Sequence, residues 1–119
     1  MYPFDYVKPS SVAEAAAKLA EDADAMLLAG GMTLIAALAQ RLAMPSRLID
    51  LATIPGLDGI VELRSALRIG AMTCHAEVAG SAVVNKAIPA LAQLADGIGD
   101  VQVRHRGTLG GSIANNDPA

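Results

Sequence analysis

Two glycine pairs are the parts of this sequence whose residue types and spacing favour ligand chemistry. The first, Gly30-Gly31, follows the apolar run Ala25–Ala29 and precedes Thr33, where helical spacing of apolar residues begins. Glycine lets the backbone approach a ligand closely, and the unpaired amides of a helix start favour a phosphate or pyrophosphate. The pair fits equally well a strand-to-helix turn that needs glycine only for its backbone angles. It does not match the G-x-G-x-x-G dinucleotide fingerprint, because no third glycine stands at the required offset.

The second pair, Gly110-Gly111, lies in the segment Gly107–Ser112, with Arg104 and Arg106 just upstream. Taken alone, this segment favours a glycine-weakened strand or a bulge. Hydroxyl groups stand near both pairs, at Thr33, Thr108 and Ser112. The two turns could therefore converge from two subdomains on one diphosphate ligand, although spacing along the chain does not establish that convergence.

The histidines, His75 and His105, could act as bases, but no serine or cysteine nucleophile stands beside them in a recognisable motif. No H-E-x-x-H or His-x-His spacing is present. Cys74 adjoins His75, yet neighbouring residues in a helix or strand point in different directions, so we expect Cys74 to pack as a small side chain. We therefore name no catalytic side chain and no metal site.

The elements that position the first glycine pair are expected to alternate between helix and strand. Ser11 and Glu14 form an S-x-x-E capping box that predicts a helix from Val12 to Glu21. The further expected elements are a strand over 25–29 buried on both faces, a helix from Thr33 to Pro45 with Leu42 on its apolar face, and a strand over 47–51. An α-β-α-β order of this kind predicts parallel strands, which need helical crossovers.

Beyond residue 57 the pattern changes. Short apolar runs at 59–63 and 67–71 predict a hairpin. Thr73 is expected to cap a short helix through Glu77, and a second helix begins near Pro89 and ends at Gly97. We therefore divide the chain into residues 1–57 and residues 58–119.

Composition bounds the class of protein. Hydrophobic residues make up 53% and charged residues 18%, which excludes intrinsic disorder, and the scarcity of aromatics predicts an interior of small, closely packed side chains. A net charge of −3 and a pI near 5.2 argue against nucleic acid as a partner. The single cysteine fits a reducing compartment. Neither a signal peptide nor an apolar run long enough to span a bilayer is present, so the expected location is the cytoplasm.

The segments Leu27–Leu34 and Thr108–Asn115 resemble the two FAD-binding segments of the flavoprotein (medium) subunit of molybdenum hydroxylases, the family of carbon monoxide dehydrogenase and xanthine dehydrogenase. Connecting pieces are similar too, among them Pro3–Tyr6, Leu48–Leu51 and Ile69–Thr73. The resemblance implies an α+β fold of the PCMH or vanillyl-alcohol-oxidase type, in which FAD lies between two subdomains. Residues 1–57 would form the small α/β subdomain, and residues 58–119 would form the first part of the larger α+β subdomain.

The resemblance also implies which residues contact FAD. The first segment would wrap the diphosphate and the second would form another glycine clamp; the residues are Leu27, Leu28, Ala29, Gly30, Gly31, Met32, Thr33, Leu34, Thr108, Leu109, Gly110, Gly111 and Ser112. We expect larger side chains at Gly30 and Gly31 to abolish flavin binding and to leave the fold intact, because a Cβ atom would occupy the space of diphosphate oxygens.

The implied partners are a molybdenum-containing large subunit and an iron–sulfur small subunit, from which electrons would pass through FAD to an acceptor. FAD would carry the redox chemistry, and the protein would supply position and electrostatics. Two alternatives remain open: a flavin-free assembly or interaction module, and an unrelated phosphate- or nucleotide-binding α/β domain.

Members of the family are considerably longer than this chain. We therefore expect the hairpin of residues 59–71 and a strand near 108–114 to lack sheet partners and to leave an apolar face. The chain should then self-associate, or join another chain that completes the sheet.

Overall fold

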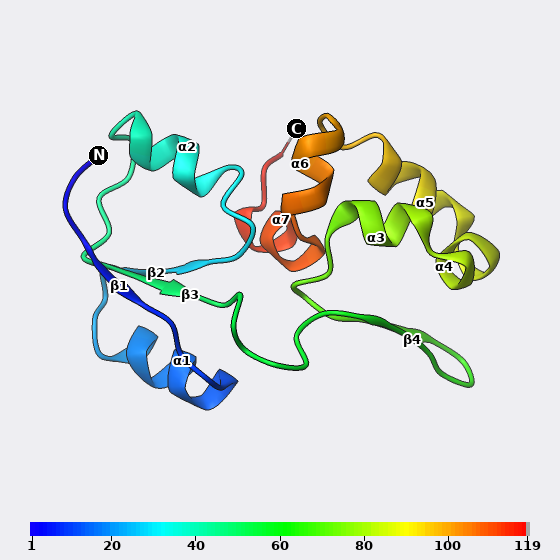
Figure 1. The fold of residues 1–119 in the computed structure, drawn as a ribbon, viewed down its shortest axis with the longest axis horizontal. Coiled ribbons are helices and arrows are strands. Elements are labelled where there is room, and N and C mark those ends of the chain that lie inside the picture. The colour runs from blue at the N-terminus through cyan, green and yellow to red at the C-terminus, as the bar shows by residue number, and fades with distance from the viewer. Residues whose placement is uncertain (119) are drawn as a thin grey trace. The chain divides into compact units, whose positions relative to one another are not determined.

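A computed structural model describes residues 1–118, which fold as two compact units that divide between Pro55 and Gly56. The first unit contains β1 (Asp5–Val7), α1 (Val12–Ala20), β2 (Ala25–Leu28), α2 (Leu34–Ala39) and β3 (Arg47–Asp50). The second contains β4 (Ile60–Glu62), β5 (Leu67–Ile69), α3 (His75–Gly80), α4 (Ala82–Ala87), α5 (Pro89–Asp96), α6 (Val101–Arg106) and α7 (Leu109–Asn115) (Figure 1).

The first unit is a three-stranded parallel sheet in the order β1-β3-β2. Helix α1 lies on one side of this sheet and α2 on the other (Figure 1). The expected parallel α-β-α-β order is confirmed, and the sequence analysis missed the additional strand β1. The central strand β3 contributes two buried core side chains, Leu48 and Ile49, and it lies between strands β1 and β2.

Helix α1 begins as its capping box predicts. The hydroxyl of Ser11 accepts a hydrogen bond from the amide of Glu14 at 3.1 Å, which satisfies one of the free amides of the first turn. The carboxylate of Glu14 does not return to Ser11; it accepts from the amide and hydroxyl of Ser10, at 2.8 and 2.9 Å. The start of helix α1 is therefore stabilised by the Ser11 cap and by the contact of Glu14 with Ser10, the residue before the cap.

Two expectations about β2 and α2 are wrong. Strand β2 is an edge strand, so it is not buried on both faces: Met26 is 39% and Leu27 is 43% exposed. Helix α2 ends at Ala39 rather than at Pro45, because Arg41 adopts a left-handed conformation (φ 57°) that stops the helix. Leu42 then lies beyond the helix and is exposed.

The second unit pairs β4 with β5 as an antiparallel hairpin, which confirms the prediction for residues 59–71. Its helices pack around a core of small side chains formed by Val78, Val84, Ala92 and Ala95. Helix α5 begins at Pro89 and is followed by Gly97, as expected. The sequence analysis missed helix α4.

Two other expectations in this unit are wrong. Thr73 does not cap the helix that follows it: α3 begins at His75 after Cys74, and Thr73 is buried with its hydroxyl accepting from the amide of Gly59 at 3.0 Å. Residues 108–114 are not a strand that lacks sheet partners, because they form most of helix α7. A single bridge between Cys74 and Thr108 is the only extended pairing that this segment makes within the described residues.

Within residues 1–118, no helix is both long enough and apolar enough to span a membrane. The same residues contain no group of three or more histidine, cysteine or acidic side chains that could hold a metal ion.

Candidate functional site

The first glycine pair lies in the loop that joins the carboxyl end of β2 to the start of α2. Gly31 has a positive φ of 79°, which reverses the chain directly after Gly30. The carbonyl oxygen of Gly31 then accepts the amide of Ile35 at 2.9 Å, and that of Thr33 accepts Ala37 at 3.0 Å. The loop thus turns the chain from strand into helix within four residues, 30–33.

The main-chain amides of this loop are free. None of the amides of residues 30–33 donates a hydrogen bond to any of the described residues. Thr33 is exposed, and its hydroxyl makes no capping bond. Consecutive unpaired amides in a turn with a left-handed residue form a concave site that suits an anion such as a phosphate group. The amide loop, as we call residues 30–33, therefore offers backbone donors and one free hydroxyl.

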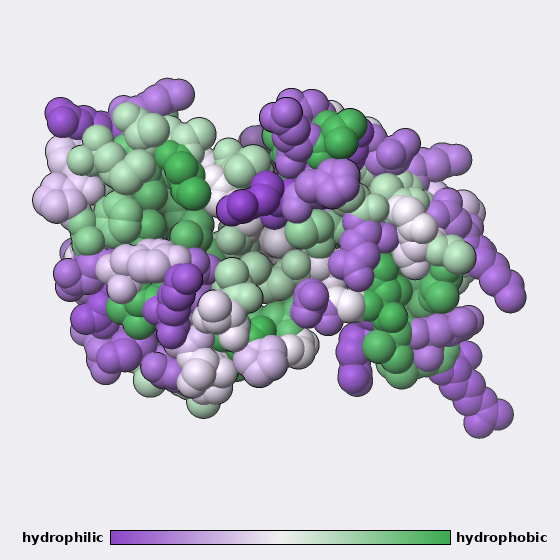
Figure 2. Space-filling view, in the orientation of Figure 1, coloured by the Kyte–Doolittle hydropathy of each residue, from purple (hydrophilic) through white to green (hydrophobic). Residues whose placement is uncertain are grey.

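The apolar residues of the first segment divide between the interior and the surface. Leu28 is buried under the amide loop, whereas Leu27 and Met32 are 43% and 39% exposed. Ala29 and Leu34 are half-buried. Apolar side chains gather on the surface over α2 (Figure 2), where Ile35 is 41% exposed. An apolar ligand surface could therefore pack beside the amide loop without rearranging the core.

Our reason for the effect of a larger side chain at Gly31 is wrong. A Cβ atom there would point to the side chains of Ile35 and Leu28, with the Cδ1 atom of Ile35 only 2.6 Å away. It would not enter open space in front of the loop. Because φ is also positive, a substitution at Gly31 strains the fold itself, so flavin binding and folding would change together.

The second glycine pair occupies the first turn of α7, and its amides are all engaged. Leu109 donates to the carbonyl oxygen of Thr73 at 3.0 Å, and Gly110 donates to that of Ala71 at 2.8 Å. The amide of Gly111 donates to the hydroxyl of Thr108 at 3.0 Å, and the amide of Ser112 donates to the Thr108 carbonyl at 3.1 Å. This segment has no free amides with which to cradle an anion, unlike the amide loop.

Thr108 and Gly110 have structural roles in this segment. Thr108 is 3% exposed and caps α7. Gly110 lies against the backbone of Ala71, where an added Cβ atom would stand 2.7 Å from its carbonyl oxygen. Ser112 differs from both, because it is exposed and its hydroxyl lies 3.0 Å from the Nε2 atom of His75. Within this segment, Ser112 is thus the residue that presents a polar side chain at the surface.

Sequence reasoning gave no structural role to His75, which the structure places beneath α7. The side chain is 2% exposed, and its amide donates to the carbonyl oxygen of Gly107 at 3.0 Å. Burial lowers the pKa of His75 below its usual value of 6.5, so the ring is neutral near pH 7. The signal in the sequence was a lone histidine at the start of a helix, which alone could not reveal a contact with Ser112.

The remaining candidate nucleophile and base, Cys74 and His105, each lie near a different backbone carbonyl oxygen. Cys74 is half-buried, with its Sγ atom 3.9 Å from the carbonyl oxygen of Arg106. Burial, and then the charge of Glu77, raise the pKa of the Cys74 thiol, which is therefore protonated near neutral pH. His105 is exposed, and its Nδ1 atom lies 2.7 Å from the carbonyl oxygen of Val101.

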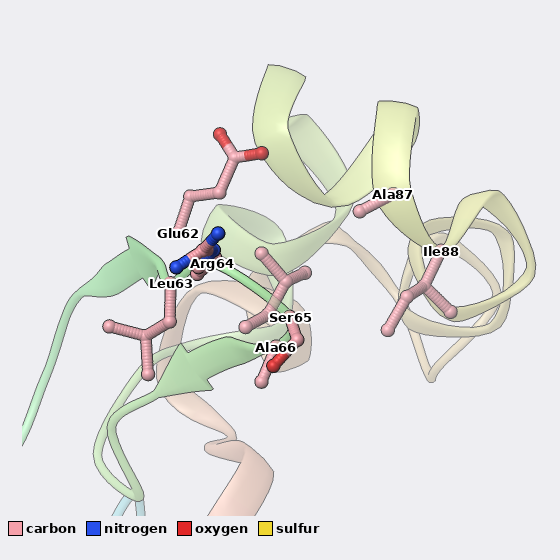
Figure 3. Close-up of a pocket in the computed structure, with 8 residues that line it drawn as sticks. Glu62, Leu63, Arg64, Ser65, Ala66, Ala87 and Ile88 are labelled. Atoms are coloured by element: carbon pink, nitrogen blue, oxygen red, sulfur yellow. The ribbon is translucent and has the colours of Figure 1, made fainter.

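A pocket of about 280 Å³ lies between the hairpin and the junction of α4 with α5. Its walls are the hairpin tip, residues 62–67, together with Ala87 and Ile88 (Figure 3). None of the residues expected to contact FAD lines this pocket, and we assign it no ligand.

The first glycine segment belongs to the unit that ends at Pro55 and the second to the unit that begins at Gly56. The fold and the amide loop together define an α+β protein whose first unit carries a turn of unpaired backbone amides. The match to known proteins is more specific.

Residues 2–119 match the family model described as the FAD binding domain in molybdopterin dehydrogenase. The carbon monoxide dehydrogenase medium chain of Hydrogenophaga pseudoflava is 47% identical over 116 residues, which cover 97% of this chain and 40% of that protein. The nicotine 6-hydroxylase medium subunit of Paenarthrobacter nicotinovorans is 41% identical over 114 residues, covering 96% and 40%. The chain thus spans about 40% of the length of these curated relatives.

Solved structures agree with the sequence matches. The structure of carbon monoxide dehydrogenase from Hydrogenophaga pseudoflava that lacks the Mo-pyranopterin moiety of its molybdenum cofactor superposes with a TM-score of 0.95 at 47% identity, covering 99% of this chain and 42% of that one. Quinoline 2-oxidoreductase from Pseudomonas putida 86 gives a TM-score of 0.93 at 39% identity, covering 98% and 41%. The chain belongs to the FAD-binding domain family of molybdopterin dehydrogenases and has its α+β fold.

Proposed function

We propose that this chain holds FAD in a subunit of a molybdenum hydroxylase-type dehydrogenase. The observation that carries the proposal is the amide loop, because residues 30–33 present consecutive unpaired amides and the free hydroxyl of Thr33 at one place. A diphosphate needs several hydrogen-bond donors of this kind. FAD, when bound, accepts electrons from one partner and passes them to another.

The proposal assigns different tasks to different parts of the two segments. Amides and hydroxyl of the amide loop bind the diphosphate, while the exposed side chains of Leu27 and Met32 pack against apolar parts of the cofactor. The buried Leu28 and the half-buried Leu34 support the loop from within. Residues 108–112 contribute the surface of the first turn of α7 and the hydroxyl of Ser112. The proposed FAD-binding subdomains, residues 1–57 and 58–119, would correspond to the two units, which divide two residues earlier, between Pro55 and Gly56.

None of these residues needs to act as an acid, a base or a nucleophile. The task of the protein is to hold the flavin at a fixed place and in a fixed electrostatic environment, and the redox chemistry belongs to the cofactor. We further propose that electrons reach FAD from a molybdenum-containing large subunit through an iron–sulfur small subunit. The printed names of the relatives, a medium chain and a medium subunit, support an assembly of unequal chains.

Exposed apolar surface supports the proposal that the chain self-associates or is covered by another polypeptide. In the first unit, Leu42 and Met44 are 75% and 68% exposed; in the second, Ile113 is 70% exposed. Side chains of this size seldom stay in water without a partner when they cluster. The free Cys74 thiol supports a reducing, cytoplasmic location.

Titration of the chain with FAD tests the proposal, with retained yellow colour as a first indication. Thr33→Val should weaken binding about tenfold or more, because it removes one hydrogen bond to a charged group and keeps the side-chain shape. Thr53→Val is the matched control in the same unit, outside the amide loop. Equal losses for both variants, or a chain that binds no FAD, would reject the proposed function; a colourless chain that captures partner subunits would favour an assembly module.

A further inference from the structure

The contact between His75 and Ser112 joins a fully buried ring to an exposed hydroxyl. The Nε2 atom of His75 lies 3.0 Å from the Oγ atom of Ser112. Ser112 is the exposed polar side chain of the second glycine segment, while His75 is 2% exposed beneath it. The two residues are 37 positions apart, and the contact exists because main-chain hydrogen bonds join residues 71–75 to residues 107–110.

The surroundings of His75 determine which ring nitrogen carries the proton. The Nδ1 atom is buried and has no hydrogen-bond partner among the described residues. A buried N–H without an acceptor costs more than an unused lone pair, so the proton belongs on Nε2. Nε2–H then donates to the Oγ atom of Ser112, whose own hydrogen must point elsewhere.

We propose that His75 is a positioning residue that turns the Ser112 hydroxyl outward as a hydrogen-bond donor to an oxygen atom of FAD. This inference rests on the proposed function and deepens it. The amides of residues 109–112 are all engaged inside the protein, and Thr108 is buried. The Ser112 hydroxyl is therefore the exposed donor that this segment can offer. His75 Nε2–H occupies one of the two lone pairs of the Ser112 oxygen, so the hydroxyl hydrogen points away from His75 and is available to a ligand atom that accepts.

Nitrogen NMR of the flavin-free chain, labelled with ¹⁵N-histidine, tests the proton position directly. The chain has two histidines, and the second is an internal reference. The Nδ1 atom of His105 lies 2.7 Å from a carbonyl oxygen, which can only accept, so His105 carries its proton on Nδ1. The neutral forms of the two rings should show opposite tautomers, and a His105→Gln variant assigns the signals. A proton on Nδ1 of His75, or a charged ring, would overturn the inference.

A double-mutant cycle on FAD affinity tests the coupling. Ser112→Ala should weaken binding about tenfold, because it removes the outward donor, and the exposed position lets the variant fold. His75→Leu should lose a similar factor in the parent but change affinity less than about twofold in the Ser112→Ala background. His75→Gln, whose amide can still donate to Ser112, should recover most of the affinity. Far-UV circular dichroism checks that each variant is folded.

The possible outcomes separate the inference from the function on which it rests. A chain that binds no FAD overturns both. A chain that binds FAD, but whose His75 and Ser112 substitutions lose affinity independently, overturns the inference and leaves the proposed function standing. Coupled losses with rescue by His75→Gln, together with the proton on Nε2, support it.

Discussion

Replacing Gly31 with alanine should destabilise the first unit by about 1.5–3.5 kcal/mol. The left-handed conformation at φ 79° costs a residue with a Cβ atom about 1–2 kcal/mol. The new atom would also stand 2.6 Å from the Cδ1 atom of Ile35. Since Ile35 is 41% exposed, its side chain can rotate away, which adds about 0.5–1.5 kcal/mol for an unfavourable rotamer.

Other glycines separate these two contributions. Gly56 has a similar φ of 81° and nothing within 4 Å of an added Cβ atom, so Gly56→Ala should show the conformational cost alone. Gly80 also has nothing within 4 Å, and it lies in helix α3 without a positive φ. Gly80→Ala should therefore stabilise the protein by about 0.5–1 kcal/mol.

Urea unfolding followed by far-UV circular dichroism measures these differences, since the chain has no tryptophan. With a slope of about 1–3 kcal/mol per molar urea, a loss of 2 kcal/mol lowers the midpoint by roughly 1 M. The expected order of stability is Gly80→Ala, parent, Gly56→Ala, Gly31→Ala. A Gly31→Ala chain as stable as the parent would refute the assignment of a left-handed, closely packed position in the amide loop.

Three further predictions concern the remaining site and the acid limit of the fold. Thr108→Val should destabilise the chain by about 1–2 kcal/mol through loss of the α7 cap, whereas Thr33→Val should stay within about 0.5 kcal/mol of the parent in the same urea assay. Gly110→Ala should lower the midpoint more than Gly80→Ala raises it, because the backbone of Ala71 cannot move aside as a side chain can. Hydrogen bonds from Ser10 and Ser46 are the largest causes that lower the pKa values of Glu14 and Asp22, respectively. The stabilisation that these carboxylates give is therefore complete above their usual pKa values of 4.5 and 3.8, and it is lost as the pH falls through their pKa values in the folded chain. Acid titration of the circular dichroism signal should show this loss, and a chain equally stable at pH 3 and pH 6 would contradict it.

Local signals in the sequence were sufficient where the structure is decided locally. The start of α1 depends on Ser11 and Glu14, which lie within one helical turn of each other. The β4–β5 hairpin joins segments separated by four residues, 63–66. In both cases the chemistry that fixes the element lies inside a short window of sequence, so pattern alone was enough.

Prediction failed where a distant partner decides the structure. Residues 108–114 could have extended as a strand; they form a helix because Thr108 caps it and because the amides of Leu109 and Gly110 find carbonyl oxygens at Thr73 and Ala71. The exposure of β2 depends on the strand order β1-β3-β2, which the apolar run over 25–29 does not reveal. The contact of His75 with Ser112 likewise depends on hydrogen bonds between residues 71–75 and residues 107–110, which are far apart in the sequence.

The two glycine segments look equivalent in the sequence, but they differ in whether their main-chain amides have hydrogen-bond acceptors. A buried amide needs an acceptor, and the second segment finds its acceptors within its own unit. Its Gly110 serves close packing against Ala71. In the first segment, the amides of residues 30–33 meet no acceptor in the described chain, which leaves them to water or to a ligand. Removing the hydroxyl should therefore change affinity without changing stability at Thr33, where it is a free donor, and should change stability first at Thr108, where it accepts from the amide of Gly111. FAD affinity and stability towards urea should be measured for Thr33→Val and for Thr108→Val. Similar changes in the two variants would contradict these different roles.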